Sequence, residues 1–264
     1  MSSVSSRRFL RRMSDRLSAS VMLCLLALSG CSGEDDFGAD ISEPTLQPES
    51  DGRFHVREGE SIQAALDAAA QMRGHKQVVV HSGIYRPQIP SQAMIRFLAR
   101  HDGIQLEAEG NVTLTAANDQ LANPTADSFP AVVNHVLYFG HGVSSKTVLR
   151  GFHITGANGF VITSQTGGDI LEPHHSNPKL KKGMFFHSDG GAIKVFGQSS
   201  PTLIDLRIEE NRTVLCGGGI SIENCGYVKQ ATRIENCVFR KNICPGTGSA
   251  IDVLEGSVAE IRNC

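Results

Sequence analysis

The sequence predicts an all-β solenoid, in which short strands stack into parallel sheets from one coil of the chain to the next. A glycine-led segment with alternating apolar residues occurs three times, at 190–195, 217–222 and 248–253, with spacings of 27 and 31 residues. Alternation of this kind is typical of a strand with one buried face. A strand this short cannot bury that face alone, whereas coils stacked at about 4.8 Å share one core and satisfy each other's backbone hydrogen bonds. The 27 Gly residues also indicate many tight turns.

The first 30 residues have the layout of an export signal. Five Arg precede an apolar run at 21–28, which is far shorter than the roughly 20 residues that span a bilayer. Residues 28–31 (Leu-Ser-Gly-Cys) resemble the lipobox of bacterial lipoproteins, in which the Cys is acylated and becomes the new N-terminus. The resemblance implies that Cys31 carries lipid and that the protein is anchored in the bacterial envelope, with Ser32 favouring the outer membrane. An ordinary cleaved signal is the alternative, and export by the Sec or the twin-arginine route stays open.

Residues 31–53 form a predicted acidic, flexible tether. The stretch 32–51 contains seven Asp or Glu and no Lys or Arg, so its charge is −7. The rest of the chain, 52–264, carries about +1. This charge provides no field that would hold a polyanion, so we expect no nucleic-acid partner.

A short helix is predicted where the domain begins. Residues 61–69 are rich in Ala, and Ser61 is a suitable N-cap. The apolar side of this helix can cover the open end of the first coil, and Gly74 can stop it. The next apolar run, 78–85, predicts the first long strand.

A second repeated segment alternates with the first. Residues 203–211 recur as 234–242 and begin a third time at 261–264, and Ile154 upstream is equivalent to Ile208. Asn, Asp and Gly separate the strands, as is usual at turns. Stacked polar side chains at such turns bond to neighbouring backbone. We expect two ladders of this kind, one formed by Asp205, Asn236 and Asn263 and the other by Asn211 and Asn242.

The repeats carry a family resemblance. Residues 190–193 (Gly-Gly-Ala-Ile) and 239–242 (Phe-Arg-Lys-Asn) match the GGAI and FxxN elements of bacterial polymorphic outer-membrane proteins. The whole pattern resembles the right-handed parallel β-helices of the pectate-lyase-like superfamily. The resemblance covers residues 54–264 and implies a right-handed parallel β-helix with a short N-terminal capping helix. It implies a fold rather than one activity.

The other end of the solenoid lacks a recognisable cap. The sequence stops at Cys264, within the third copy of the second repeat. Because an uncovered last coil exposes strand edges and core, we expect either a partner at this end or further coils from a longer reading frame.

The cysteines follow the repeats. Cys237 and Cys264 occupy equivalent inward positions, where small apolar side chains stack. Cys216 and Cys244 both lie in turns after equivalent Asn residues, so a disulfide between them is plausible in an exported protein. No Cys-x-x-Cys or Cys/His spacing appears, so the cysteines themselves predict no metal site.

Chemistry on a solenoid belongs on outward strand positions and adjoining loops, because the interior is filled. The outward column of Lys194, Ser221 and Asp252 offers a cation, a hydroxyl and a carboxylate, which suit a uronic sugar or a calcium ion. A solvated sheet face is the alternative.

A long insertion precedes this column. The interval from Ile154 to Ile193 is 27 residues longer than the equivalent intervals downstream, and residues 172–182 contain two Pro, two His and three Lys. One extra coil is possible in the insertion, but its middle predicts a protruding loop, whose bases, cations and aromatic rings suit an acidic polysaccharide. The expected ligand-binding residues are Lys194, Asp189, Asp252, Phe185 and Phe186.

An enzyme is a second hypothesis. Elimination from a uronate needs a base for the C5 proton and a cation beside the carboxylate. The candidate bases are Lys181, His187 and Arg207, and the candidate calcium ligands are Asp189 and Asp252. A hydrolase would need paired carboxylates at a defined separation, and the sequence names none. Residues 140–142 (Gly-His-Gly) resemble one short motif of polygalacturonases, but the accompanying motifs are absent and the tripeptide reads as a turn.

The sequence therefore predicts an exported, lipid-anchored surface protein that binds extracellular or envelope polysaccharide or protein, touching the membrane only through its N-terminal lipid. The alternative is a pectate-lyase-like polysaccharide lyase acting on acidic polysaccharide. A purely structural envelope component is the third hypothesis. Calcium is the one cofactor that the column suggests.

Overall fold

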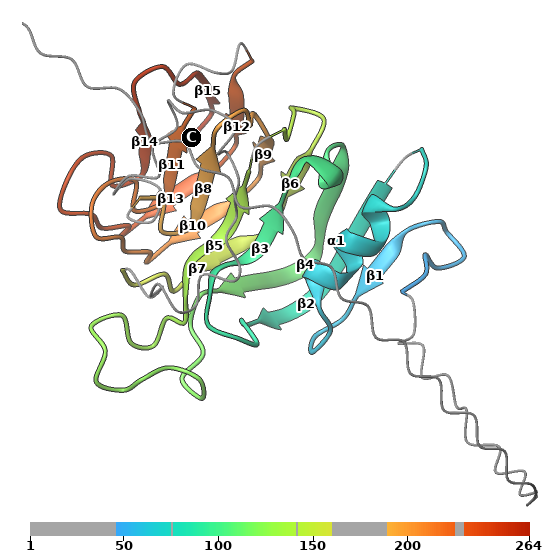
Figure 1. Cartoon of the computed structure of the whole chain (residues 1–264), viewed down its shortest axis with the longest axis horizontal. Coiled ribbons are helices and arrows are strands. Elements are labelled where there is room, and N and C mark those ends of the chain that lie inside the picture. Colours follow the sequence, from blue (N-terminus) through green and yellow to red (C-terminus); the bar gives the residue numbers. More distant parts are fainter. Residues whose placement is uncertain (1–45, 75, 141, 160–188, 225–229) are drawn as a thin grey trace, which may run out of the picture. The chain divides into compact units, whose positions relative to one another are not determined.

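The structure is a computed structural model that describes residues 46–74, 76–140, 142–159, 189–224 and 230–264 (Figure 1). The predicted signal peptide and most of the predicted tether lie outside these residues. Within them the protein is almost entirely β, with strands that pair in parallel in two sheets. This confirms the all-β class and the parallel stacking.

The larger sheet has ten strands. Its members are β1 (Phe54–Val56), β2 (Lys76–Tyr85), β4 (Ile104–Thr115), β6 (Val148–Arg150), β7 (His153–Thr155), β9 (Thr202–Ile204), β10 (Arg207–Glu209), β12 (Thr232–Glu235), β13 (Val238–Arg240) and β15 (Ala259–Arg262). The long strand β4 pairs with β6 through its first half and with β7 through its second half. In later coils the same path is divided into two short strands by a turn.

The smaller sheet has five strands in the order β14-β11-β8-β5-β3. Its members are β3 (Ser91–Phe97), β5 (Val133–Phe139), β8 (Ile193–Phe196), β11 (Ile220–Glu223) and β14 (Ile251–Val253). Each strand belongs to a successive coil, and Figure 1 shows them side by side. The connection that enters this sheet has ten residues both between β10 and β11 and between β13 and β14.

The observed register confirms the repeats. Ile193, Ile220 and Ile251 pair across β8, β11 and β14. Ile208 pairs with Ile154, and the start of the third copy of the second repeat pairs with the copy before it. These side chains form part of one continuous apolar core between the sheets. Burial of that stripe in every coil is what fixes the register, since a one-residue slip would expose it.

Both predicted turn ladders are present. Asn236 Nδ2 donates to Asp205 Oδ1 at 3.1 Å, and Asn263 Nδ2 donates to Asn236 Oδ1 at 3.3 Å. All three residues have φ between 52° and 56°. Asn and Asp tolerate this left-handed conformation better than other non-glycine residues. In the second ladder, Asn211 donates through its backbone and side-chain nitrogens to Asn242 Oδ1, both at 3.1 Å.

The predicted helix is α1 (Ile62–Ala70), which lies beside β1 and β2 in Figure 1. Ser61 caps it by accepting a hydrogen bond from the Ala64 amide at 3.1 Å. Its buried face joins the core and covers the first coil. The helix ends before Gly74, which instead turns the chain into β2 at φ 89°. A 3₁₀ turn, η1 (Ala99–His101), follows β3.

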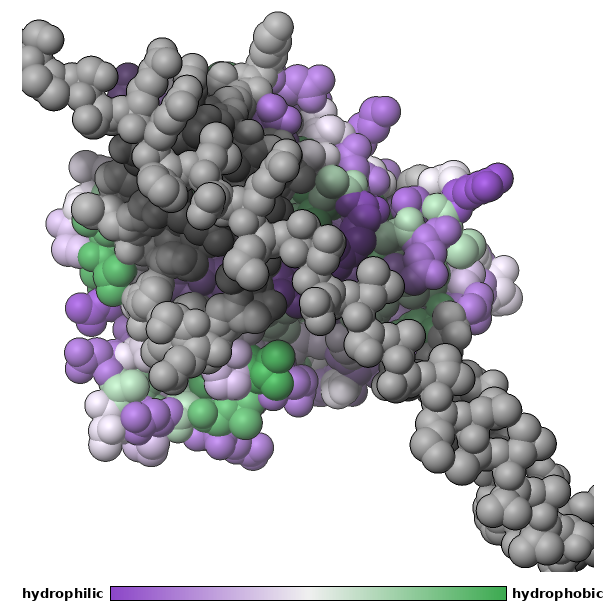
Figure 2. Space-filling model, viewed as in Figure 1, coloured by the Kyte–Doolittle hydropathy of each residue, from purple (hydrophilic) through white to green (hydrophobic). Residues whose placement is uncertain are grey.

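The described part of the surface carries both polar and apolar side chains. Figure 2 shows exposed apolar side chains scattered among hydrophilic ones on the visible face. Among the described residues, Ile89 and Ile243 are the most exposed large apolar side chains, at 67% and 58%. Across the same described residues, no helix is both long enough and apolar enough to cross a bilayer.

Candidate functional site

The predicted column of Lys194, Ser221 and Asp252 forms as expected, but it is buried. The three residues align across β8, β11 and β14. Lys194 and Ser221 have no exposed surface, and Asp252 is 9% exposed. The alternative of a solvated sheet face is therefore wrong, and so is the expectation of an open binding face at these positions.

The ammonium group of Lys194 is held by hydrogen bonds. Its Nζ donates to Glu223 Oε2 at 2.7 Å and to Ser221 Oγ at 3.2 Å. Nζ also lies 5.9 Å from the ring centroid of Phe196. A buried charge needs such partners, because desolvation otherwise costs several kcal/mol. Lys194 is thus committed to this ion pair within the protein.

A second polar column lies beside the first. Asp189, Cys216 and Thr247 each stand four residues before the aligned Ile of β8, β11 or β14. The glycine after each of them has positive φ, between 65° and 77°. At Gly217 an added Cβ would lie 2.7 Å from the Ile220 carbonyl oxygen, so the turn is too tight for a side chain. This turn brings the first column and the second column together.

Hydrogen bonds orient the acidic groups in these columns. The Cys216 amide donates to Asp189 Oδ1 at 3.1 Å, and Thr247 Oγ1 donates to Asp252 Oδ1 at 3.1 Å. Thr247 Oγ1 also lies 3.5 Å from Cys216 Sγ. Ligand atoms of Asp189, Cys216 and Asp252 lie within 4.8 Å of one another. The structure therefore brings together the two predicted metal ligands, Asp189 and Asp252, and adds Cys216.

The surroundings of Asp189 disfavour the charged form of its carboxyl. Burial raises its pKa to about 6, and Glu223 and Asp252 act in the same direction. Lys194 and the Cys216 amide oppose this shift without cancelling it. The ionised form of Asp189 is thus less favourable than that of an exposed carboxyl.

His135 supports the turn next to Asp189. Its Nδ1 lies 2.5 Å from the carbonyl oxygen of Gly190, and its Nε2 lies 2.9 Å from the amide nitrogen of Gln92. Because a carbonyl only accepts and an amide nitrogen only donates, these partners assign the proton to Nδ1. Nothing in the sequence selects His135, because its role depends on a neighbour 55 residues away.

Arg207 lies apart from this cluster, on β10 of the larger sheet. Its guanidinium is exposed and pairs with Glu209 Oε2 at 2.8 Å. The hydrogen bond from Arg207 lowers the pKa of Glu209. His153 Nε2 lies 3.5 Å from the same carboxylate, and burial lowers the pKa of His153. Arg207 is thus a paired cation rather than a free base.

The remaining predicted site residues lie outside the part of the chain that the structure describes. They are Lys181, Phe185, Phe186, His187 and the lipidation candidate Cys31. Their predicted roles stay predictions.

The proposed disulfide between Cys216 and Cys244 is not formed in the structure, where both are free thiols. Ile243 pairs with Arg212, so Cys244 aligns with Thr213 and not with Cys216. The register neighbour of Cys216 is Thr247. Location in a turn after an equivalent Asn was therefore an unreliable guide to the register, since Cys216 is five residues after Asn211 and Cys244 only two after Asn242. The buried position of Cys237 is as predicted, and burial raises its pKa to about 12.

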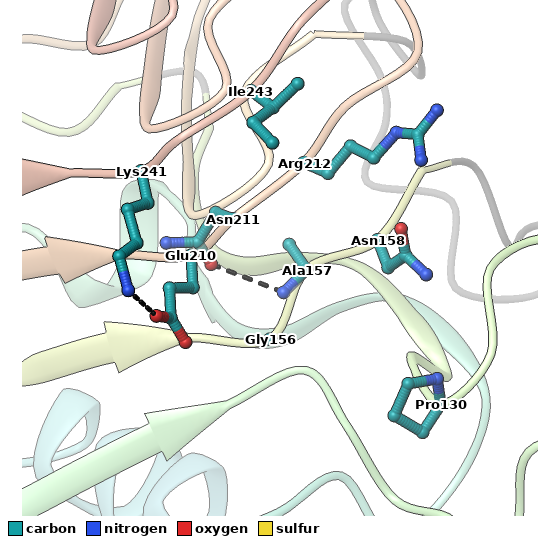
Figure 3. Close-up of a pocket in the computed structure, with 9 residues that line it drawn as sticks. All are labelled: Pro130, Gly156, Ala157, Asn158, Glu210, Asn211, Arg212, Lys241 and Ile243. Atoms are coloured by element: carbon teal, nitrogen blue, oxygen red, sulfur yellow. Dashed lines mark hydrogen bonds and ion pairs between the residues drawn. The ribbon is translucent and has the colours of Figure 1, made fainter.

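A pocket of about 420 Å³ opens in the turns that follow β7, β10 and β13. Figure 3 shows the ion pair of Lys241 and Glu210, 3.0 Å long, on one side and Arg212, Asn158 and Pro130 on the other. The pocket is lined by Pro130, Gly156, Ala157, Asn158, Glu210, Asn211, Arg212, Lys241 and Ile243.

Polar groups of this pocket differ in how they are engaged. Asn158 Nδ2 donates to the carbonyl oxygens of Asp127 and Phe129 at 3.3 and 2.9 Å, which leaves its Oδ1 as an acceptor. Arg212 is exposed, and its guanidinium forms no ion pair with any described residue. The exposed side chain of Ile243 adds an apolar wall. The sequence does not reveal this pocket. Its residues come from turns of different coils, and only the stacking of the coils shows that these turns lie side by side.

A scan against protein-family models and searches of curated proteins and of solved structures found no match to this chain.

Proposed function

We propose that this protein is an exported, lipid-anchored surface protein whose right-handed parallel β-helix binds acidic polysaccharide. The observation that carries the proposal is the pocket of Figure 3, whose lining combines the exposed Arg212 with apolar side chains from successive coils. Its volume of about 420 Å³ falls within the usual range for small-molecule pockets.

The pocket offers each kind of contact that a uronate needs. The guanidinium of Arg212 can hold the sugar carboxylate through paired hydrogen bonds, which Arg forms better than Lys. Ile243 and Pro130 can pack against the apolar face of the ring. Asn158 Oδ1 can accept from a hydroxyl. A neutral sugar would lack the charged contact and is expected to bind more weakly.

The anchoring part of the proposal is supported by the sequence. Residues 28–31 supply the lipobox-like Leu-Ser-Gly-Cys, and the acidic stretch 32–51 would hold the domain away from a membrane of like charge. The GGAI and FxxN repeats support the β-helix. Mass measurement of the mature N-terminus tests acylation of Cys31 directly.

Binding is favoured over catalysis by the described residues. A lyase needs an available base next to a cation. Arg207 is paired with Glu209, and the buried ammonium of Lys194 is paired with Glu223. Arg207 is thus not available to abstract a proton in the way that the elimination hypothesis requires, and the other two candidate bases, Lys181 and His187, lie outside the described residues.

The test is calorimetric titration of the purified full chain with oligogalacturonate and with a neutral oligosaccharide of equal length. We expect binding of the acidic ligand alone, weakened at least tenfold by Arg212→Gln. Arg233→Gln is the matched control, because Arg233 is also an exposed Arg, with 52% of its side chain accessible, on β12. Equal loss in both variants, or equal affinity for the neutral ligand, would refute the pocket assignment. Ultraviolet absorbance from unsaturated products in the same mixtures would establish the lyase instead.

A further inference from the structure

A cluster of potential metal ligands lies apart from the pocket lined by Arg212 and Ile243, on the outer side of β8, β11 and β14. Asp189 and Cys216 come from the turns before β8 and β11, and Asp252 comes from β14 itself. Their ligand atoms, two carboxylate oxygens and one sulfur, lie within 4.8 Å of one another. Three successive coils thus each supply one potential ligand.

Two carboxylate oxygens in this cluster have no hydrogen-bond partner among the described residues. Asp189 has no exposed surface, and its Oδ2 makes no hydrogen bond. Asp252 Oδ2 is also buried and without a hydrogen bond. The other oxygen of each carboxylate is held by the Cys216 amide or by Thr247 Oγ1. Each side chain is therefore oriented by the protein while one oxygen stays open.

The charge around these oxygens is not balanced. Lys194 is the nearby cation, and its Nζ pairs with Glu223 Oε2 at 2.7 Å. Lys194 also acts on Asp189 through space, but neither aspartate forms an ion pair with a described residue. Leaving buried carboxylates unpaired costs several kcal/mol, so a bound cation would be strongly favoured here.

The donor set selects the kind of cation. Calcium and magnesium take oxygen ligands only, and calcium needs six to eight of them. A thiolate with two carboxylates instead suits zinc, which bonds oxygen at about 2.0–2.2 Å and sulfur at about 2.3 Å. Side chains already this close need only small rotations to share one ion. The observed set therefore differs from the calcium site that the two aspartates alone suggested.

We propose that Asp189, Cys216 and Asp252 bind one zinc-class divalent cation. Binding releases the Cys216 thiol proton to solvent, because thiolate is the form that ligates. With three protein ligands, a water molecule completes the tetrahedral shell. The ion links three coils, adding to the backbone ladders and to the Lys194–Glu223 ion pair between β8 and β11, so it stabilises the stack.

Groups next to the three proposed ligands are placed to orient their side chains. Thr247 Oγ1 lies within hydrogen-bonding reach of both Asp252 Oδ1 and Cys216 Sγ, as an outer-shell group that orients two ligands would. His135 fixes the Gly190 carbonyl next to Asp189. The tight glycine at 217 sets the direction of Cys216.

The test uses the reduced full chain, stripped with a chelator and titrated with Co²⁺ as a spectroscopic probe for zinc. We expect a thiolate-to-cobalt charge-transfer band that saturates at one equivalent and is displaced by Zn²⁺ but not by Ca²⁺. Cys216→Ser abolishes the band, and the matched control Cys244→Ser keeps it. Asp189→Asn and Asp252→Asn each weaken binding at least tenfold.

Several outcomes overturn the proposal. They are no cobalt uptake by the folded chain, a band unchanged in Cys216→Ser, or displacement by Ca²⁺ as effective as by Zn²⁺. If circular dichroism shows that Cys216→Ser does not fold, the two Asn variants decide, since unchanged affinity in both contradicts the site.

Discussion

Asp189 and Cys216 occupy the same turn position in successive coils, and the amide of the second donates to the carboxylate of the first at 3.1 Å. Two chemically different side chains are thus placed in contact by one repeated backbone turn. The glycine that follows each of them makes this possible, because it adopts positive φ in a space that no Cβ could enter.

The turn glycine gives the first prediction. Gly217→Ala places a Cβ 2.7 Å from the Ile220 carbonyl oxygen at φ 65°. We expect the free energy of unfolding to fall by about 3 kcal/mol or more, since steric overlap adds to the left-handed backbone cost. Urea denaturation measures this. Gly103→Ala is the matched control, because Gly103 has φ 79° but nothing within 4 Å, so it should lose only about 1–2 kcal/mol. Equal losses would show that the close contact is relieved by movement.

The Asn ladder gives the second prediction. Asn242→Ala removes the acceptor of two Asn211 donors and a donor to the Ile208 carbonyl at 2.8 Å. Leaving these groups unpaired should cost about 1–3 kcal/mol of unfolding free energy. Asn111→Ala, at an exposed Asn, should change it by less than about 0.5 kcal/mol. A ladder that contributes nothing would give the two variants the same denaturation midpoint.

The buried ion pair gives the third prediction. Lys194→Met leaves Glu223 buried without its ammonium partner, and we expect a loss of about 3–5 kcal/mol. Glu223→Gln in the same chain should recover part of that loss, because the uncompensated charge is gone. The double-mutant cycle, measured by urea unfolding, isolates the pair. Strictly additive losses would mean that the two groups do not interact.

Asp67 gives a pH-dependent prediction. Burial pushes its pKa up, but hydrogen bonds from His101 and Arg100 outweigh that and lower the pKa from 3.8 to about 2. A lowered carboxyl pKa contributes stability that is present above pH 4 and is lost as the pH falls through 2. Asp67→Asn should therefore cost about 1 kcal/mol at pH 7, a discounted figure because the side chain is 41% exposed.

The measurement for Asp67 is the stability difference from the parent chain along a pH series. The difference should shrink as the pH falls from 4 toward 2. Asp119→Asn, at an exposed carboxylate, is the control and should show no such trend. A difference that is constant with pH would assign the effect to packing instead of to charge.

Much of the fold was predictable because each coil repeats the same local pattern. The alignment of Ile193 with Ile220, the Ser61 cap and the Asp205 ladder each depend on spacing or on a local preference, which the sequence displays directly. Burial of Lys194 was not predictable, because it depends on a carboxylate 29 residues away. The register inside turns was also hidden, so Thr247 and not Cys244 came to lie beside Cys216.

The lengths of the connections between strands have a practical consequence. The passage into the smaller sheet has ten residues between β10 and β11 and between β13 and β14 but 37 between β7 and β8, and the passage out of it has five between β8 and β9 and eight between β11 and β12. The chain thus accommodates different lengths on both sides of the coil. The passage between β10 and β11 contains Arg212 and Cys216, whereas the residues described for the cluster and the pocket do not include any between β11 and β12. An epitope or a fluorescent tag inserted between β11 and β12 would therefore leave both sites in place, and a graft of the same length between β10 and β11 would not.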